Sequence, residues 1–224
     1  MNPVITIDGP SASGKSSVSR ELARRLGWKW VSTGAFYRGL AYVAFREGMD
    51  LNDAKSLVKL SQSSDIWHVR MDDDQTRVYY RGEEITDSIG MAENALRASQ
   101  VSQLAEVREA LLANQRACNS APGLVAEGRD CGTVVFPEAV LKVYLTASER
   151  ERASRRAREQ GLDVSQTQSE QKKRDQQDSM RTAAPLKIPE DAKVVDSGGM
   201  PLDKVVDQIH EWALQALAQS VKSF

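Results

Sequence analysis

Short apolar runs alternate with longer amphipathic stretches along most of the chain. In the stretch after the first run, Val18, Leu22 and Leu26 recur at the spacing of one helix face. Buried strands separated by such helices are typical of an α/β fold, so we expect a five-stranded parallel sheet with helices on both faces. The apolar runs that predict its strands are 4–7, 28–31, 124–127, 141–145 and 193–196. Further helices are predicted over 35–46 and 50–61 and from about 205 onward.

Residues 66–80 break this pattern. Apolar and polar side chains alternate over 66–71 and again over 76–80, on either side of a polar turn, which predicts a small antiparallel sheet. We therefore expect an inserted segment, which together with a helix predicted over 96–119 forms a subdomain over 62–118. The whole chain, residues 1–224, is expected to be one domain.

Residues 150–182 are polar and rich in arginine. Helices are predicted over 148–160 and 169–182, with a loop over 161–168 between them. This hairpin is either a solvated surface element held by i,i+4 ion pairs or a mobile lid. We favour a lid over 150–182, because a hairpin with little apolar surface can open without exposing a core, and its arginines can close over a phosphate.

The loop after the first strand carries the clearest chemical motif, which fits the spacing G-x-x-x-x-G-K-[ST] at every fixed position. It consists of Gly9, Pro10, Ser11, Ala12, Ser13, Gly14, Lys15 and Ser16. The strand before it and the helix after it supply the context of a P-loop, in which backbone N–H groups at a helix start bind phosphate. Lys15 adds a charge for the β- and γ-phosphates, and the Ser16 hydroxyl is the expected protein ligand of Mg²⁺. The sequence therefore predicts a site for ATP with Mg²⁺.

Composition and charge narrow the possible partners. The 224 residues have a formal net charge of −1, so no overall field draws the chain to nucleic acid or to an anionic membrane. No apolar run approaches the length of a membrane span, and we expect a cytoplasmic protein. Cys118 and Cys131 form neither a close pair nor a metal-ligand spacing, which favours free thiols in a reducing compartment. We expect a monomer, because the pattern shows no extra apolar face.

Two arginines lie where a phosphate-bearing ligand would reach them. Arg38 and Arg129 each follow shortly after a predicted strand, and in a parallel sheet the carboxyl ends of the strands border the ligand cleft. The guanidinium group binds phosphate through two parallel hydrogen bonds. Arg108 lies on the predicted helix of the inserted segment and does not follow a strand of the parallel sheet. Taken alone, it is a surface charge.

These features together resemble one family, the bacterial-type cytidylate kinases. The likeness rests on the P-loop and on residues 33–38 (TGAFYR), 128–137 (GRDCGTVVFP), 174–175 (RD) and 181–186 (RTAAPL). It spans nearly the whole chain, and the antiparallel segment resembles that family's enlarged nucleoside-monophosphate domain. P-loops occur in many nucleotide-binding proteins, whereas the segment at 128–137 is far more specific.

The resemblance implies a role for each candidate site residue. The residues implied to hold the ATP phosphates are Gly9, Pro10, Ser11, Ala12, Ser13, Gly14, Lys15, Ser16 and Ser17. Those implied to hold CMP are Thr33, Tyr37, Arg38, Ser99, Arg108, Arg129, Asp130, Arg174, Asp178 and Arg181. Within that set, Arg38 and Arg129 would bind the monophosphate and Tyr37 would line the acceptor site. The residues implied to contact cytosine are Thr33, Arg108, Asp130 and Arg181. Those implied to contact the ribose are Ser99, Arg174 and Asp178. The implied catalytic residues are Lys15, Arg38, Arg129, Arg174 and Arg181.

The implied reaction is the phosphorylation of CMP and dCMP by ATP, a transfer to a phosphate acceptor in pyrimidine nucleotide metabolism. The acceptor oxygen is already a nucleophile near neutral pH, so positioning and charge neutralisation suffice. Two alternatives stay open: a kinase for another nucleoside monophosphate (UMP or AMP), or a non-enzymatic P-loop switch. Two positions depart from the family pattern, because Ser32 and Glu127 stand where Asp is common. Glu127 still offers a carboxylate that can hold Mg²⁺ through water.

Overall fold

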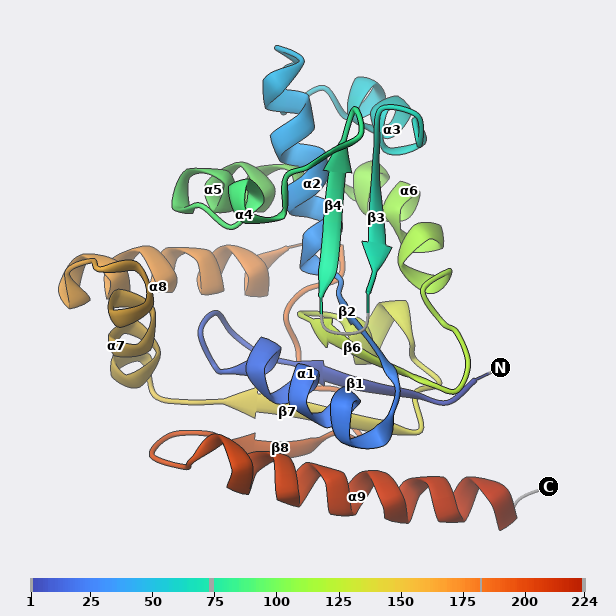
Figure 1. Cartoon of the computed structure of the whole chain (residues 1–224). Coiled ribbons are helices and arrows are strands. Elements are labelled where there is room, and N and C mark those ends of the chain that lie inside the picture. The colour runs from blue at the N-terminus through green and yellow to red at the C-terminus, as the bar shows by residue number, and fades with distance from the viewer. Residues whose placement is uncertain (1, 73–74, 182, 223–224) are drawn as a thin grey trace.

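Five parallel strands form the central sheet of the computed structural model, which describes residues 2–72, 75–181 and 183–222. Along the sheet the strands stand in the order β2-β6-β1-β7-β8 (Figure 1). Their bounds are Val4–Asp8 for β1, Lys29–Ser32 for β2, Leu124–Gly128 for β6, Leu141–Thr146 for β7 and Lys193–Asp196 for β8. The predicted five-stranded parallel sheet is confirmed, and β1, which leads into the P-loop, lies at its centre.

Helices cover both faces of this sheet, each over its own core. One face packs against α1 and α9, and the other shares a core with α2 and α6, against which α3 packs in turn. Their bounds are Lys15–Leu26 for α1, Gly34–Arg46 for α2, Ala54–Ser61 for α3, Ala105–Arg116 for α6 and Leu202–Lys222 for α9. Successive strand residues point to opposite faces, so Val125 enters the first core while Leu124 and Ala126 enter the second. None of the helices within the described ranges is both long enough and apolar enough to cross a membrane.

The chain between α3 and β6 carries the predicted antiparallel sheet. It is formed by β3 (Trp67–Met71), β4 (Thr76–Tyr80) and β5 (Glu83–Glu84). The sheet lies so close to α2 that a Cβ atom at Gly39 would crowd Trp67. The predicted pair of strands is confirmed, and the short β5 extends it. A one-turn helix, α4 (Thr86–Ile89), follows and was not predicted.

The single helix predicted over 96–119 is wrong, because the structure has two helices there. α5 spans Ala92–Val101 and α6 spans Ala105–Arg116. The backbone N–H of Leu104 donates to the carbonyl of Val101 at 3.2 Å, an i→i−3 bond that tightens the end of α5. Leu104 then takes an extended conformation, and α6 starts in a new direction (Figure 1).

The polar hairpin consists of α7 (Glu149–Gln160) and α8 (Val164–Met180), which pack together at one end of the sheet (Figure 1). The predicted start of the second helix at residue 169 is wrong. The carboxylate of Asp163 accepts the backbone N–H of Gln166 at 3.0 Å and caps the helix earlier. The loop between the two helices is therefore shorter than the predicted 161–168.

Candidate functional site

The carboxyl ends of the parallel strands open into one cleft of about 300 Å³. β1 ends in the P-loop, β2 runs into Thr33, and β6 runs into Arg129 and Asp130. The register of the sheet pairs Ser32 with Glu127. Segments that lie far apart in the sequence therefore meet along this edge.

The P-loop wraps around the start of α1 with backbone shapes that require glycine. Gly14 has a φ of 87°, and Gly9 lies so close to the carbonyl of Leu145 that a side chain there would overlap it. Lys15 Nζ donates to the carbonyl of Pro10 at 2.6 Å, within the loop. Burial lowers the pKa of Lys15 to about 8. The loop thus holds a partly desolvated ammonium group where phosphate charge would stabilise it.

One pair of oxygens beside the P-loop suits a magnesium ion. The Ser16 hydroxyl donates to a carboxylate oxygen of Glu127 at 2.9 Å. Hydroxyl and carboxylate oxygens are ligands that Mg²⁺ takes in nucleotide sites, where it keeps several waters. Within the described ranges no group of three or more His, Cys, Asp or Glu side chains is able to hold a metal ion. The residues present therefore fit an ion that is shared with bound phosphates, not one held by an all-protein cage.

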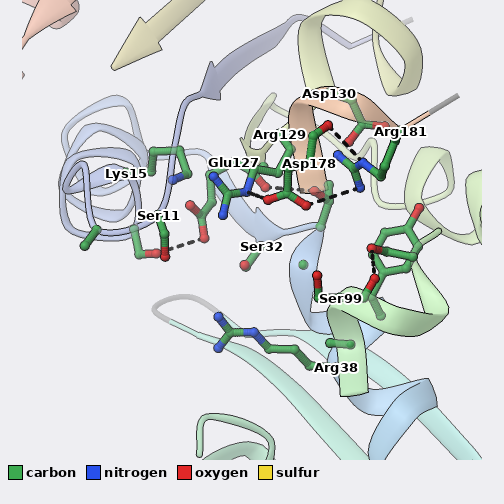
Figure 2. A pocket seen from close by; sticks show the side chains of 18 of the residues that line it. Ser11, Lys15, Ser32, Arg38, Ser99, Glu127, Arg129, Asp130, Asp178 and Arg181 are labelled. Carbon is green, nitrogen blue, oxygen red and sulfur yellow. Dashed lines mark hydrogen bonds and ion pairs between the residues drawn. The ribbon is translucent and has the colours of Figure 1, made fainter. Parts of the chain in front are cut away.

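Arginine side chains approach the cleft from opposite sides. Figure 2 shows Arg38, from α2, across the pocket from Arg129. Burial and the nearby Arg156 cation lower the pKa of Arg38. Arg156 comes from α7 and lines the same cleft. The positive charges of Arg38 and Arg156 repel each other, so an anion bound between them would lower the electrostatic energy of the site.

Arg129 links the P-loop to helix α8 of the polar hairpin. Its Nη1 donates to the carbonyl of Gly9 at 3.0 Å, and its Nε lies 3.0 Å from a carboxylate oxygen of Asp178. Asp178 also lies 3.9 Å from Arg181 (Figure 2). On the opposite wall, the Ser99 hydroxyl donates to Gln177 of α8 at 3.1 Å. Helix α8 thus contacts Arg129, which is bound to the P-loop, and Ser99 of α5.

Another part of the cleft holds a buried ion pair. A guanidinium nitrogen of Arg108 and the carboxylate of Asp130 are directly hydrogen-bonded, and each side chain is only 7% exposed. Arg108 also lies over the ring of Tyr37, 5.1 Å from its centroid. Two buried donors, Arg108 Nε and Arg181 Nη2, have no hydrogen-bond partner among the described residues. Carboxylate oxygens and unpaired donors together suit the polar edge of a nucleobase.

A buried carboxylate that the sequence analysis missed, Asp8, holds the segment after β6. Its two oxygens accept the backbone N–H groups of Cys131 at 2.9 Å and Gly132 at 2.7 Å. These residues begin a single π-helical turn over Cys131–Val135. Burial raises the pKa of Asp8 to about 6, although the two N–H donors oppose the shift. Because Asp8 ends β1 directly before the P-loop, its place at a strand end was the available signal.

Three arginines of α7 had been predicted only as members of a polar helix. Arg156 lines the cleft, and Arg152 donates to the carbonyl of Ser11 at 3.0 Å. Arg155 donates to the carbonyl of Ser197 at 2.5 Å, in the loop after β8. Positions 152, 155 and 156 share one helix face, and that spacing could have singled them out.

The structure brings most of the predicted site residues into this one cleft. From the predicted ATP set, the residues that line it are Ser11, Ala12, Gly14, Lys15, Ser16 and Ser17. From the predicted CMP set, they are Thr33, Tyr37, Arg38, Ser99, Arg108, Arg129, Asp130, Asp178 and Arg181. Gly9, Pro10 and Ser13 belong to the loop without lining the cleft. Arg174 lies in α8, but its side chain is outside the part of the chain that the structure describes.

Comparison with known proteins places the chain in a family. A profile of the family described as cytidylate kinase matches residues 5–215. The chain belongs to the cytidylate kinase family. A cytidylate kinase from Bdellovibrio bacteriovorus is 56% identical over 213 residues, which cover 95% of this chain and 98% of the relative. A cytidylate kinase from Pseudomonas paraeruginosa is 47% identical over 213 residues, with coverage of 92% and 93%.

Solved structures extend the likeness at the level of the fold. A gluconokinase from Sinorhizobium meliloti 1021 matches with a TM-score of 0.50 and 18% identity, covering 99% of this chain and 94% of that chain. An uncharacterized protein from Eubacterium ventriosum ATCC 27560 matches with a TM-score of 0.51 and 12% identity, covering 94% and 98%. The predicted P-loop kinase fold is confirmed, as is the predicted family. The alternatives, a kinase for another nucleoside monophosphate or a non-enzymatic switch, are not favoured.

Proposed function

We propose that this chain transfers the γ-phosphoryl group of ATP to the phosphate of CMP or dCMP, giving ADP and CDP or dCDP. One observation carries the proposal: a single cleft joins a P-loop to a buried Arg108–Asp130 pair. Membership of the cytidylate kinase family supports the cytidine substrate. dCMP differs from CMP by one hydroxyl group, so the contacts proposed below for base and phosphate serve both.

The buried pair and its neighbours account for recognition of cytosine. Cytosine presents an exocyclic amine that donates hydrogen bonds, and O2 and N3 that accept them. Asp130 accepts from the amine, and the unpartnered donors of Arg108 and Arg181 serve the two acceptors. Thr33, which lines the same cleft, adds a hydroxyl oxygen as acceptor. Adenine offers an amine and one neighbouring acceptor but has no counterpart of O2, and uracil has an acceptor (O4) in place of the amine and a donor (N3–H) in place of N3. Each of these bases therefore leaves buried groups unpaired.

Positioning of the two substrates and positive charge around their phosphate groups account for catalysis of the transfer. An oxygen of the acceptor monophosphate attacks the γ-phosphorus as the bond from that phosphorus to the β-phosphate oxygen breaks, and no general base is needed. Lys15 binds the donor phosphates, and Arg38 and Arg129 hold the acceptor, with Arg174 and Arg181 as the further catalytic cations. Ser16 and Glu127 would hold Mg²⁺, which supplies further positive charge to the donor phosphates when bound.

The polar hairpin at 150–182 acts as the lid, and residues 62–118 act as the monophosphate-binding subdomain. Ser99 and Asp178, one on each side of the cleft, accept hydrogen bonds from ribose hydroxyls. Closure excludes water, which would otherwise compete with the acceptor for the γ-phosphoryl group. We further propose a cytoplasmic monomer that binds no nucleic acid. Both cysteines are buried and free, which suits a reducing compartment.

An ADP-release assay with a panel of acceptors tests the function. ATP and Mg²⁺ are supplied with CMP, dCMP, UMP, AMP, GMP or no acceptor. We expect rapid ADP release with CMP and dCMP, and slow release with the others. Preference for another monophosphate would contradict the cytosine contacts while leaving the phosphate contacts in place. ADP release that ignores every acceptor would instead indicate a P-loop NTPase.

A further inference from the structure

Asp175 lies where the lid helix α8 meets the P-loop, and none of the roles proposed above uses it. One oxygen of its carboxylate accepts the backbone N–H of Ser11 at 3.2 Å. The other oxygen is directly hydrogen-bonded to Arg152 of α7. The side chain of Asp175 is only 17% exposed, and that of Arg152 only 7%. A lid carboxylate thus binds the phosphate loop itself.

Arg152 completes this contact from the other helix of the lid. Its Nη1 donates to the carbonyl of Ser11 at 3.0 Å, and its Nε donates to the carbonyl of Ala147 at 3.2 Å. Both backbone groups of Ser11 are therefore bound by one Asp–Arg pair, the N–H by Asp175 and the carbonyl by Arg152. The pair fixes the position of a P-loop residue relative to both lid helices.

Asp175 also approaches Arg129, the proposed acceptor clamp. Arg129 Nη1 lies 3.5 Å from the Asp175 carboxylate, and its Nε lies 3.0 Å from Asp178, one helical turn further along α8. The same Nη1 donates to the carbonyl of Gly9. The Asp175 carboxylate therefore contacts the P-loop at Ser11, the lid at Arg152 and the proposed acceptor site at Arg129. Its position couples these three parts of the site.

We infer that Asp175 is a positioning residue that joins lid closure to the arrangement of the P-loop and Arg129. It acts through Ser11, Arg152 and Arg129, and contacts no reacting atom. The role needs a carboxylate, because both oxygens accept at once. In Asp175→Asn one acceptor becomes an NH₂ donor, which would face either an N–H group or a guanidinium cation. The contribution of Arg129 to phosphoryl transfer rests on the proposed function, whereas the contact between lid and loop does not.

Hydrogen exchange measured without nucleotides tests the contact between lid and loop. In Asp175→Asn we expect the amides of the P-loop, 9–16, and of α8, 164–180, to exchange about tenfold faster, since either the Ser11 N–H or the Arg152 guanidinium then faces an NH₂ group in place of an acceptor. β6 is the internal reference and should not change. Glu170→Gln is the matched control, because Glu170 is exposed on the same helix. Wild-type exchange in both segments of Asp175→Asn would overturn the inference, whatever the activity of the enzyme.

A ratio of two rates tests whether Asp175 affects phosphoryl transfer. The rate of ATP hydrolysis without acceptor is divided by the rate of phosphoryl transfer to CMP, so the ratio does not depend on the fraction of active protein. We expect this ratio to rise at least about fivefold in Asp175→Asn, because a lid that closes less firmly admits water. Asp175→Ser, which removes the charge without adding an amide donor, should raise it too. An unchanged ratio in both variants would reduce Asp175 to a structural residue and overturn the inference.

Discussion

The central sheet and the lid hairpin border the same cleft, but different forces hold them. Every residue of β1 is buried, and Ile5 and Ile7 pack beneath α1 and α9. The lid instead buries polar side chains, among them Arg152, Thr167 and Gln171. Exposing apolar surface to water costs about 25 cal/mol per Å², whereas polar side chains that leave the hairpin contacts exchange their protein partners for water. The loop proposed to bind ATP therefore belongs to the stable core, while the groups proposed to close over it lie on an element that we expect to separate at low cost.

Leu22→Ala measures the core side of this comparison. Leu22 is fully buried between α1 and the sheet. We expect the free energy of unfolding, from urea titration, to fall by about 3 kcal/mol, because the truncation removes apolar contacts and leaves a cavity. Leu214→Ala is the control, since Leu214 is 52% exposed on α9. Equal losses in the two variants would contradict the assignment of the core.

Lys15→Ala removes the charge of the P-loop without touching the apolar core. We expect kcat to fall at least about a hundredfold, because the developing phosphate charge loses its nearest cation. Lys59→Ala, at an exposed position on α3, should keep wild-type turnover. Near-normal turnover in Lys15→Ala would rule out the proposed phosphate role.

Asp130→Asn tests the base-binding part of the cleft. We choose Asn over Ala because the side chain is paired with buried Arg108, and truncation would leave that cation without a partner. We expect the ratio of kcat/KM for CMP to that for UMP to fall about thirtyfold, since an amide can turn its NH₂ toward the base, where it opposes the cytosine amine but donates to O4 of uracil. The ratio is independent of the amount of active enzyme. Unchanged discrimination would contradict the cytosine contact.

The features that local sequence encodes were predictable. The apolar run of β1 and the glycine spacing of the P-loop lie within the first 16 residues, and each follows from short-range geometry. The segment at 128–137 and the polar hairpin likewise follow from contiguous patterns. The positions of the sheet, the P-loop and the polar hairpin in the chain were therefore predictable.

Features that depend on distant partners were not predictable from local patterns. Arg108, taken alone, resembled a surface charge, yet the structure buries it against Asp130. Its position depends on the break between α5 and α6, where Ser102, Gln103 and Leu104 include no glycine or proline to announce it. The sequence singles out Asp175 only as part of the RD pair at 174–175 and gives it no role, because its partners at Ser11 and Arg129 lie far away in the sequence.

A pH profile distinguishes Lys15, which can lose its charge near neutral pH, from the arginines of the polar hairpin, which stay charged. Burial lowers the pKa of Lys15 to about 8, so its charge is present below that pH and is lost as the pH rises through it. We expect kcat/KM for ATP, which reports the free enzyme, to fall about tenfold per pH unit above about pH 8. In Lys15→Arg the side chain stays charged, so kcat/KM should not fall above about pH 8, whatever the residual activity of the variant. A flat wild-type profile up to pH 10 would contradict the lowered pKa.

Leu162→Ala makes the smallest change and compares lid with core directly. It is the same truncation as Leu22→Ala, but Leu162 is 44% exposed in the connection between α7 and α8. Little apolar contact is lost there, so the free energy of unfolding should fall by less than about 0.5 kcal/mol. The same urea titration measures both variants, and their difference gives the contrast between the two regions. A loss as large as that of Leu22→Ala would mean that the hairpin unfolds together with the core, and a lid tied to the core in that way could not open at low cost.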